Sequence, residues 1–119
     1  YGIVAGEPAG GPLIRIERIV EKPKAADAPS RMGVAGRYIL TPGVFEEIRN
    51  QPKGAGGEIQ LTDAIERLMG HQAVYAFQYE GKRYDCGSKE GFLEATVELA
   101  LQHPQVGKHF REYLKKLAL

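Results

Sequence analysis

The sequence predicts a mixed α/β fold, and three observations lead to this prediction. Residues 1–6 and 13–21 have strand composition and flank a stretch rich in glycine and proline, which is typical of a hairpin. Residues 59–69 place leucine and isoleucine at helical spacing. A further strand-like run at 74–79 precedes two more helical segments. The order of strands, helices, one strand and two helices favours a mixed sheet with flanking helices.

The second strand shows the clearest alternation. Ile14 and Ile16 alternate with Arg15 and Glu17, which predicts that one face of the strand is buried and the other is exposed to solvent. The polar, proline-containing residues 22–32 predict a loop.

The middle of the chain predicts a third strand and two helices. Residues 34–40 have strand composition, and Thr41 with Pro42 predicts a helix that begins with a hydroxyl cap and ends near residue 50. A glycine-rich loop over 52–57 leads to the helix at 59–69, for which Gly70 is a plausible stop.

The last third of the chain predicts one strand and two helices. After the strand at 74–79, Ser88 is expected to cap a helix that extends to about residue 102. A final helix after Pro104 carries apolar residues at helical spacing, namely Val106, Phe110, Tyr113, Leu114 and Leu117.

Composition excludes several classes of protein. The net charge of +1 shows no electrostatic footprint for nucleic acid or for an anionic membrane. No apolar run approaches the roughly 20 residues of a membrane span. A single cysteine, Cys86, excludes an internal disulfide framework and favours a reducing, cytoplasmic environment. The opening Tyr-Gly-Ile-Val is typical of the middle of a strand, so we expect the chain to belong to a longer protein.

The first candidate motif is Val-Glu-Lys-Pro at 20–23, where the second strand ends. Ligands of open α/β sheets bind where strands give way to loops. There, Glu21 could accept hydrogen bonds from sugar hydroxyls and Lys22 could meet phosphate charge. The alternative is a solvated ion pair at the end of a strand.

The second candidate motif is the glycine-rich stretch at 54–57 before the helix. Glycines in this place can let backbone N–H groups approach an anion, but the Lys-Ser/Thr pair of a P-loop is absent. A plain flexible turn explains the same residues equally well.

The third candidate motif surrounds Asp85, between a strand and the helix capped by Ser88. A hard carboxylate in this place suits Mg²⁺, which takes one or two protein carboxylates and completes its shell with phosphate and water. The alternative is a simple Asp-Gly turn. Cys86 has no histidine pattern beside it, so we expect a small, partly buried side chain and not a nucleophile.

Taken together, these strings resemble the family of bacterial UTP–glucose-1-phosphate uridylyltransferases, and specifically its carboxy-terminal portion. The resemblance covers residues 16–117 and rests on IVEKPK (19–24), GRYILTPGVFE (36–46), GAGGEIQLTDAI (54–65) and GKRYDCGSKEGFLEATVELAL (81–101). It implies part of a Rossmann-like nucleotidyltransferase fold. It also implies conversion of UTP and glucose 1-phosphate into UDP-glucose and pyrophosphate, with Mg²⁺ as the cofactor.

The resemblance also implies roles for four residues. Glu21 would bind glucose hydroxyls, Lys22 would contact phosphate and act in catalysis, and Gly36 would line the sugar pocket. Asp85 would lie near the metal. Residues 1–87 would form the sugar-phosphate-binding part, and residues 88–119 would make subunit contacts in a homo-oligomer.

One departure from the family pattern limits the expected activity. The family's glycine-rich loop with basic residues for the triphosphate, its uracil-recognition residues and a further metal aspartate are not found in this sequence. We therefore expect the 119-residue chain to be inactive alone. The alternatives are another sugar-1-phosphate nucleotidyltransferase, such as a thymidylyltransferase, or a non-catalytic module for sugar-nucleotide binding or oligomerisation.

Overall fold

The computed structural model describes residues 1–117, and the chain forms two compact units. The first unit is Tyr1–Glu80 and the second is Gly81–Leu119. The functional division predicted between 1–87 and 88–119 is a boundary of a different kind and stays a prediction.

The first two strands form the predicted hairpin. β1 (Gly2–Pro8) pairs with β2 (Leu13–Glu21) in antiparallel fashion. In the turn between them, Gly10 and Gly11 have φ angles of 102° and 54°. Residues with a Cβ adopt such positive φ angles only at a steric cost in free energy. A backbone hydrogen bond of 2.8 Å from the Ala9 amide to the Leu13 carbonyl closes this turn.

The hairpin is interrupted by a β-bulge at Glu17. Ala5 pairs with Arg18, whereas the next residue, Gly6, pairs with Ile16. Glu17 therefore has no residue opposite it on β1. One extra residue on one strand reverses the alternation of its side chains beyond that point.

The bulge decides which face of the sheet Glu21 occupies. Ile16 and Ile19 contribute to the same core cluster although they are three residues apart, which a regular strand would not allow. Glu21 follows Ile19 by two positions and pairs directly with Gly2. The carboxylate therefore lies on the face that the core helices cover, and the alternation read from Ile14 and Ile16 does not continue to the end of the strand.

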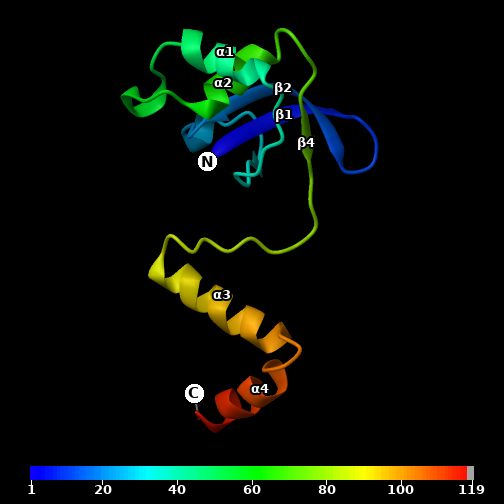
Figure 1. Cartoon of the computed structure of the whole chain (residues 1–119), viewed down its shortest axis with the longest axis vertical. Helices are drawn as coiled ribbons and strands as arrows, with labels where there is room; N and C mark the ends of the chain where they lie inside the picture. The colour runs from blue at the N-terminus through cyan, green and yellow to red at the C-terminus, as the bar shows by residue number, and fades with distance from the viewer. Residues whose placement is uncertain (118–119) are drawn as a thin grey trace. The chain divides into compact units, whose positions relative to one another are not determined.

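Two short strands complete the sheet. β3 (Met32–Gly33) pairs with β1, and β4 (Tyr75–Phe77) pairs with β2. The order is β3-β1-β2-β4 and each pair of neighbours is antiparallel. Figure 1 labels β1, β2 and β4. The predicted mixed α/β class is confirmed, as is a strand within 74–79. The predicted mixed sheet is not, because every pair of strands in the described residues is antiparallel. A 3-10 turn, η1 (Ala25–Asp27), lies in the loop before β3.

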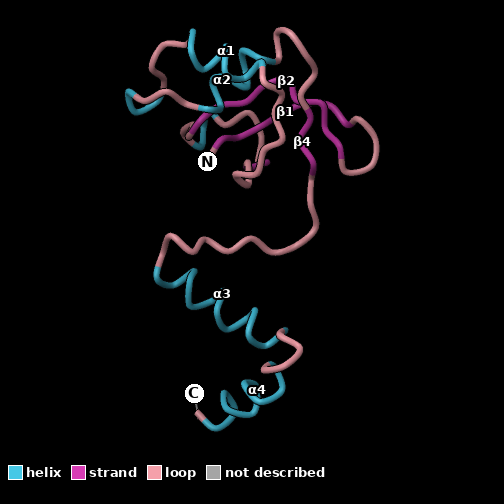
Figure 2. Tube along the Cα trace, in the orientation of Figure 1, coloured by secondary structure: helices cyan, strands magenta, loops and turns pink. Residues whose placement is uncertain are grey.

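The prediction of a strand over 34–40 is wrong. This segment forms a loop, and the only strand before α1 in this part of the chain is the two-residue β3 (Figure 2). Gly36 adopts φ 76°, outside the extended region, and the Ile39 side chain is fully exposed. Residue composition favours a strand here, but strand formation requires a neighbouring strand. The Val34 amide donates to the Gly2 carbonyl of β1 at 2.9 Å, but the paired residues of β1 and β3 end at Gly33.

Two helices cover one face of the sheet. α1 (Gly43–Asn50) packs against α2 (Leu61–Leu68), and α2 in turn contacts β2 (Figure 1). Ile65 is 2% exposed and joins Val4 and Ile19 in the core. A second cluster of Val44, Ala64 and Leu68 joins α1 to α2.

The predicted hydroxyl cap on the first helix is wrong. α1 begins at Gly43, and its N-terminal side receives no side-chain hydrogen bond. The Thr41 hydroxyl donates to Oε1 of Gln72 at 3.1 Å instead. The Thr41 hydroxyl thus makes a tertiary contact with Gln72 and does not form the helix cap that the local sequence predicts.

The second unit consists of an extended segment and two helices, α3 (Lys89–Gln102) and α4 (Gly107–Lys116). The predicted cap on α3 is confirmed, because Oγ of Ser88 accepts a hydrogen bond of 2.9 Å from the Gly91 amide. Close contact of Gly107 with the Leu101 carbonyl joins the two helices. Among the described residues, no helix is long and apolar enough to cross a membrane.

Candidate functional site

Glu21 and Lys22 mark the point where β2 ends. Lys22 has φ 44°, and within residues 1–117 no other residue apart from glycine has a positive φ. A side chain in this region typically costs about 1–3 kcal/mol, and such conformations gather at functional sites. The Lys22 amide donates to the Tyr1 carbonyl at 3.0 Å, and its side chain is exposed. The bend therefore presents a cation to solvent directly after the Glu21 carboxylate.

The Glu21 carboxylate is half-buried at the junction of β2 and α2. Its Oε2 accepts a hydrogen bond of 3.0 Å from Oγ1 of Thr62, a residue in the first turn of α2 that is 3% exposed. Gly2, which pairs with Glu21, leaves room for this contact: a Cβ on Gly2 would lie 2.9 Å from Cγ2 of Thr62 and 3.4 Å from Oε2 of Glu21.

Tyr38 also lies within electrostatic reach of Glu21. Partial burial raises the pKa of the Tyr38 phenol, and the negative charge of Glu21 raises this pKa further. Tyr38 follows Gly36, whose left-handed backbone has open space where a Cβ would be. That Gly36 lines a sugar pocket stays a prediction.

Sequence reasoning missed Thr62, Gly2 and Tyr38 as neighbours of Glu21. All three are distant from it in sequence. The hairpin register would have placed Gly2 opposite Glu21, had the bulge at Glu17 been anticipated. No local pattern marks Thr62 or Tyr38.

The glycine-rich stretch at 54–57 forms a closed turn, η2 (Ala55–Gly57). Its amides serve the turn itself: Gly54 donates to the Glu58 carbonyl at 2.8 Å, and Gly57 donates to the Gly54 carbonyl at 3.0 Å. The Asp63 carboxylate lies against Gly54. A carboxylate in this position disfavours the binding of an anion by the turn. The geometry therefore supports the interpretation of residues 54–57 as a plain turn.

Asp85 belongs to the second unit, and its place near the metal stays a prediction. Within its own unit, Asp85 makes an Asx-type turn, in which Oδ1 accepts from the Gly87 amide at 3.1 Å. Its carbonyl accepts from the Ser88 amide at 3.3 Å. Cys86 is exposed, so the expectation of a partly buried side chain there is wrong.

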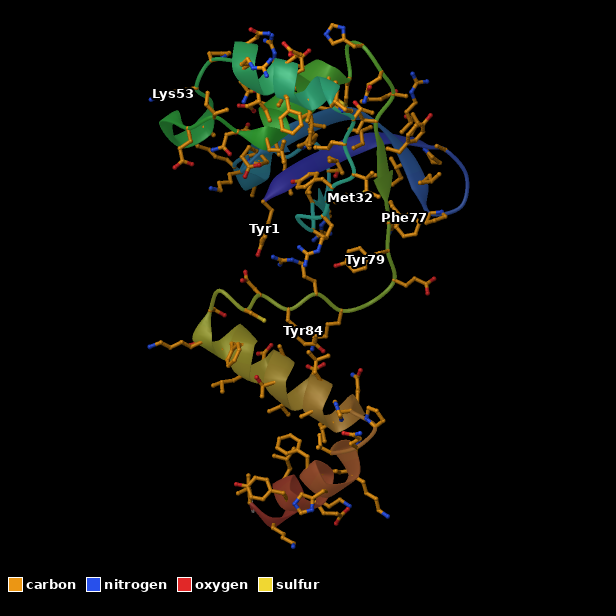
Figure 3. The ribbon with its side chains drawn as sticks, viewed as in Figure 1. Tyr1, Met32, Lys53, Phe77, Tyr79 and Tyr84 are labelled. Atoms are coloured by element: carbon orange, nitrogen blue, oxygen red, sulfur yellow. The ribbon has the colours of Figure 1, made fainter. Side chains whose placement is uncertain are left out.

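The segment that leads to Asp85 is fastened to α3 by a shared carboxylate. Tyr84, labelled in Figure 3, donates a hydrogen bond of 2.8 Å from its hydroxyl to Oε2 of Glu98. Oε1 of Glu98 pairs with the Lys82 ammonium. These hydrogen bonds, first from Lys82 and then from Tyr84, hold the pKa of the Glu98 carboxyl below its ordinary value. The network orients the residues before Asp85.

Mg²⁺ at Asp85 would need ligands beyond those that residues 1–117 bring together. Among residues 1–117, no group of three or more His, Cys, Asp or Glu side chains is arranged to hold a metal ion. Mg²⁺ needs only one or two protein carboxylates when phosphate oxygens and water complete its octahedral shell. That Asp85 holds Mg²⁺ together with phosphate oxygens and water stays a prediction.

Two hollows of the described surface lie in the first unit. One, of about 450 Å³, is lined by Ser30, Arg31, Met32, Gly33 and Gln78. Another lies along Pro12 and residues 77–80. Neither of these two hollows includes Glu21 or Lys22.

Gly91→Ala is expected to loosen the Asp85 turn. A Cβ on Gly91 would collide with the Asp85 carbonyl. Overpacking of this kind costs about 1–3 kcal/mol, which outweighs the gain of about 1 kcal/mol from alanine in a helix. Hydrogen exchange should show faster exchange of the amides in the first turn of α3. Glu90→Ala, an exposed neighbour, is the control, and slower exchange in Gly91→Ala would contradict the prediction.

Comparison with known proteins decides the family. The profile of the nucleotidyl transferase family matches residues 1–102. The chain belongs to the nucleotidyl transferase family. A UTP–glucose-1-phosphate uridylyltransferase of Staphylococcus epidermidis is 44% identical over 117 residues, which are 98% of this chain and 41% of that protein. A second such enzyme from Staphylococcus saprophyticus is 47% identical over all 119 residues and 41% of its length. The chain thus spans about two-fifths of the length of these nucleotidyl transferases.

Solved structures give the same family. A UDP-glucose pyrophosphorylase in complex with UDP-glucose superposes with a TM-score of 0.81 at 43% identity, over 87% of this chain and 39% of that one. A UTP-bound enzyme of the same kind from Acinetobacter baumannii gives 0.82 at 41% identity, over 98% and 40%. The mixed α/β arrangement is therefore a portion of the nucleotidyltransferase fold.

Proposed function

We propose that this chain is the sugar-phosphate-binding part of a UTP–glucose-1-phosphate uridylyltransferase, corresponding to the carboxy-terminal portion of that enzyme. The observation that carries the proposal is the end of β2. There, a carboxylate held by Thr62 is followed by an exposed cation on a strained backbone. Glucose hydroxyls need acceptors and the sugar phosphate needs a cation, and Glu21 with Lys22 offers both.

The whole enzyme would join UTP to glucose 1-phosphate. A phosphate oxygen of the sugar attacks the α-phosphorus of UTP, a new P–O bond forms there, and the bond to the leaving pyrophosphate breaks. Glu21 orients the hexose, and Lys22 holds the attacking phosphate and offsets part of its charge, so catalysis is mainly positioning. Asp85 would hold Mg²⁺, which neutralises phosphate charge when bound. UTP, glucose 1-phosphate and UDP-glucose are the proposed ligands.

The relatives support this assignment over the alternatives. The names of the matched enzymes specify UTP and glucose 1-phosphate, and the matched structures hold UDP-glucose and UTP. None of these names points to a thymidylyltransferase or to a non-catalytic module. Subunit contacts by residues 88–119 in a homo-oligomer remain part of the proposal, since large apolar side chains of α3 such as Phe92 and Leu93 are exposed.

The 119-residue chain is expected to bind ligand without turning it over. An NMR titration with UDP-glucose should perturb the amides of Glu21, Lys22 and Gly36. A pyrophosphate-release assay with UTP, glucose 1-phosphate and Mg²⁺ should stay at the level of a protein-free blank, because the motifs for the triphosphate are not found in this sequence. Perturbations that avoid the end of β2 would refute the proposed site, and clear turnover would refute the expected inactivity.

A further inference from the structure

Thr62 is placed where it can control the Glu21 carboxylate. It stands in the first turn of α2, 41 positions along the chain from Glu21, and is 3% exposed. Hydroxyl side chains near a helix start commonly cap the helix. α2 instead begins after Gln60 with no side-chain cap, and Oγ1 of Thr62 donates to Oε2 of Glu21 at 3.0 Å. The hydroxyl therefore serves the carboxylate and not the helix.

The direction of this hydroxyl is fixed by packing. The Thr62 methyl group, Cγ2, lies so close to Gly2 that a Cβ there would be only 2.9 Å away. A β-branched side chain has few χ1 choices in a helix, and contact on the methyl side removes more of them. One turn later, Ile65 is buried against Val4 and Ile19, which anchors α2 to the sheet. Thr62 is thus a rigid donor aimed at one oxygen.

The hydrogen bond leaves the second carboxylate oxygen available. An ionised carboxylate has about four acceptor positions. Within residues 1–117, the hydrogen bond that the Glu21 side chain receives comes from Thr62 and goes to Oε2. A carboxylate held at one oxygen keeps the other, Oε1, in a constant direction.

We infer that Thr62 is a positioning residue, which orients Glu21 so that Oε1 can accept a hydrogen bond from a sugar hydroxyl. This inference rests on the proposed function, because it assigns the sugar to Glu21. It goes beyond that function in naming the buried group on which sugar recognition depends. Without the Thr62 hydroxyl, the carboxylate would rotate among several rotamers before each binding event.

The test separates the hydroxyl from the shape of the side chain. Thr62→Val keeps the branched shape and removes the donor, whereas Thr62→Ser keeps the donor and removes the methyl group. In the 119-residue chain without ligand, NMR couplings of the Glu21 side chain should report one rotamer in the wild type and in Thr62→Ser. They should report averaging in Thr62→Val. A Glu21 side chain that keeps a single rotamer in Thr62→Val overturns the inference.

A binding measurement distinguishes this inference from the proposed function. Glucose 1-phosphate should bind about tenfold more weakly to Thr62→Val, the loss expected for one hydrogen bond to a charged group. Its affinity for Thr62→Ser should remain near that of the wild type. Inorganic phosphate, which has no sugar hydroxyls, should bind all three proteins equally.

Thr41→Val is the matched control, since it also removes a threonine hydrogen bond from the first unit. If the wild type does not prefer glucose 1-phosphate to inorganic phosphate, the proposed function fails. If that preference exists and survives in Thr62→Val, only the positioning role fails.

Discussion

Ile65→Ala is expected to lower the free energy of unfolding of the first unit by about 2–5 kcal/mol. Ile65 is 2% exposed and joins α2 to both strands of the hairpin through Val4 and Ile19. Its truncation leaves a cavity that rigid neighbours on three elements cannot fill. Folded domains are stable by only about 5–15 kcal/mol, so the change should remove a large fraction of the total. Urea denaturation measures this change in the free energy of unfolding, and hydrogen exchange of the β1 and β2 amides reports it for these strands.

Ile39→Ala is the matched control for this experiment. Ile39 lies in the same unit and is fully exposed, at 102%. Its substitution should change the free energy of unfolding by less than about 0.5 kcal/mol, as is usual for surface positions. Equal losses in the two variants would show that the core does not lie between α2 and the hairpin.

Glu21→Ala is expected to weaken the binding of UDP-glucose to the chain at least about tenfold. Hydrogen bonds to charged groups contribute about 1.5–3 kcal/mol, which corresponds to one or two orders of magnitude in affinity. The substitution also leaves the buried Thr62 hydroxyl without its acceptor, which costs about 1–3 kcal/mol of stability. Calorimetric titration and urea denaturation of the same sample report the two effects separately.

Glu17→Ala provides the control for charge and strand position. Glu17 is on β2 as well, but it is exposed at the bulge. Its removal changes the net charge by the same amount and should leave the affinity for UDP-glucose unchanged. An equal loss of affinity in both variants would mean that general electrostatics, and not the Glu21 site, attracts the ligand.

Much of the fold could be predicted from local sequence. The hairpin, α2 and the Ser88 cap of α3 follow from patterns within a few residues, and the structure contains all three. The segment 34–40 could not be predicted in the same way. Its composition favours a strand, but strand formation depends on a partner, and partners are decided at long range. The role of the Thr41 hydroxyl could not be predicted for the same reason, since it binds the distant Gln72 and does not cap α1.

The candidate site was predicted in part. Glu21 and Lys22 could be singled out because they end a strand at a charge pair, a feature visible in four residues. Thr62 could not be, since a threonine in a helix start has an adequate local explanation as a capping residue. Its contact with Glu21 depends on how α2 packs on the sheet. Sequence alone thus finds the residues that would touch ligand more readily than those that hold them.

The unpaired position at Glu17 makes the register of β2 a functional quantity. If Glu17 were paired as in a regular strand, the alternation that starts at Ile16 would turn Arg18 and Val20 toward the helices. Glu21 would then point to the opposite side of the hairpin, away from Thr62. Loss of the bulge, with every proposed ligand-binding residue still in the chain, would in this way dismantle the site.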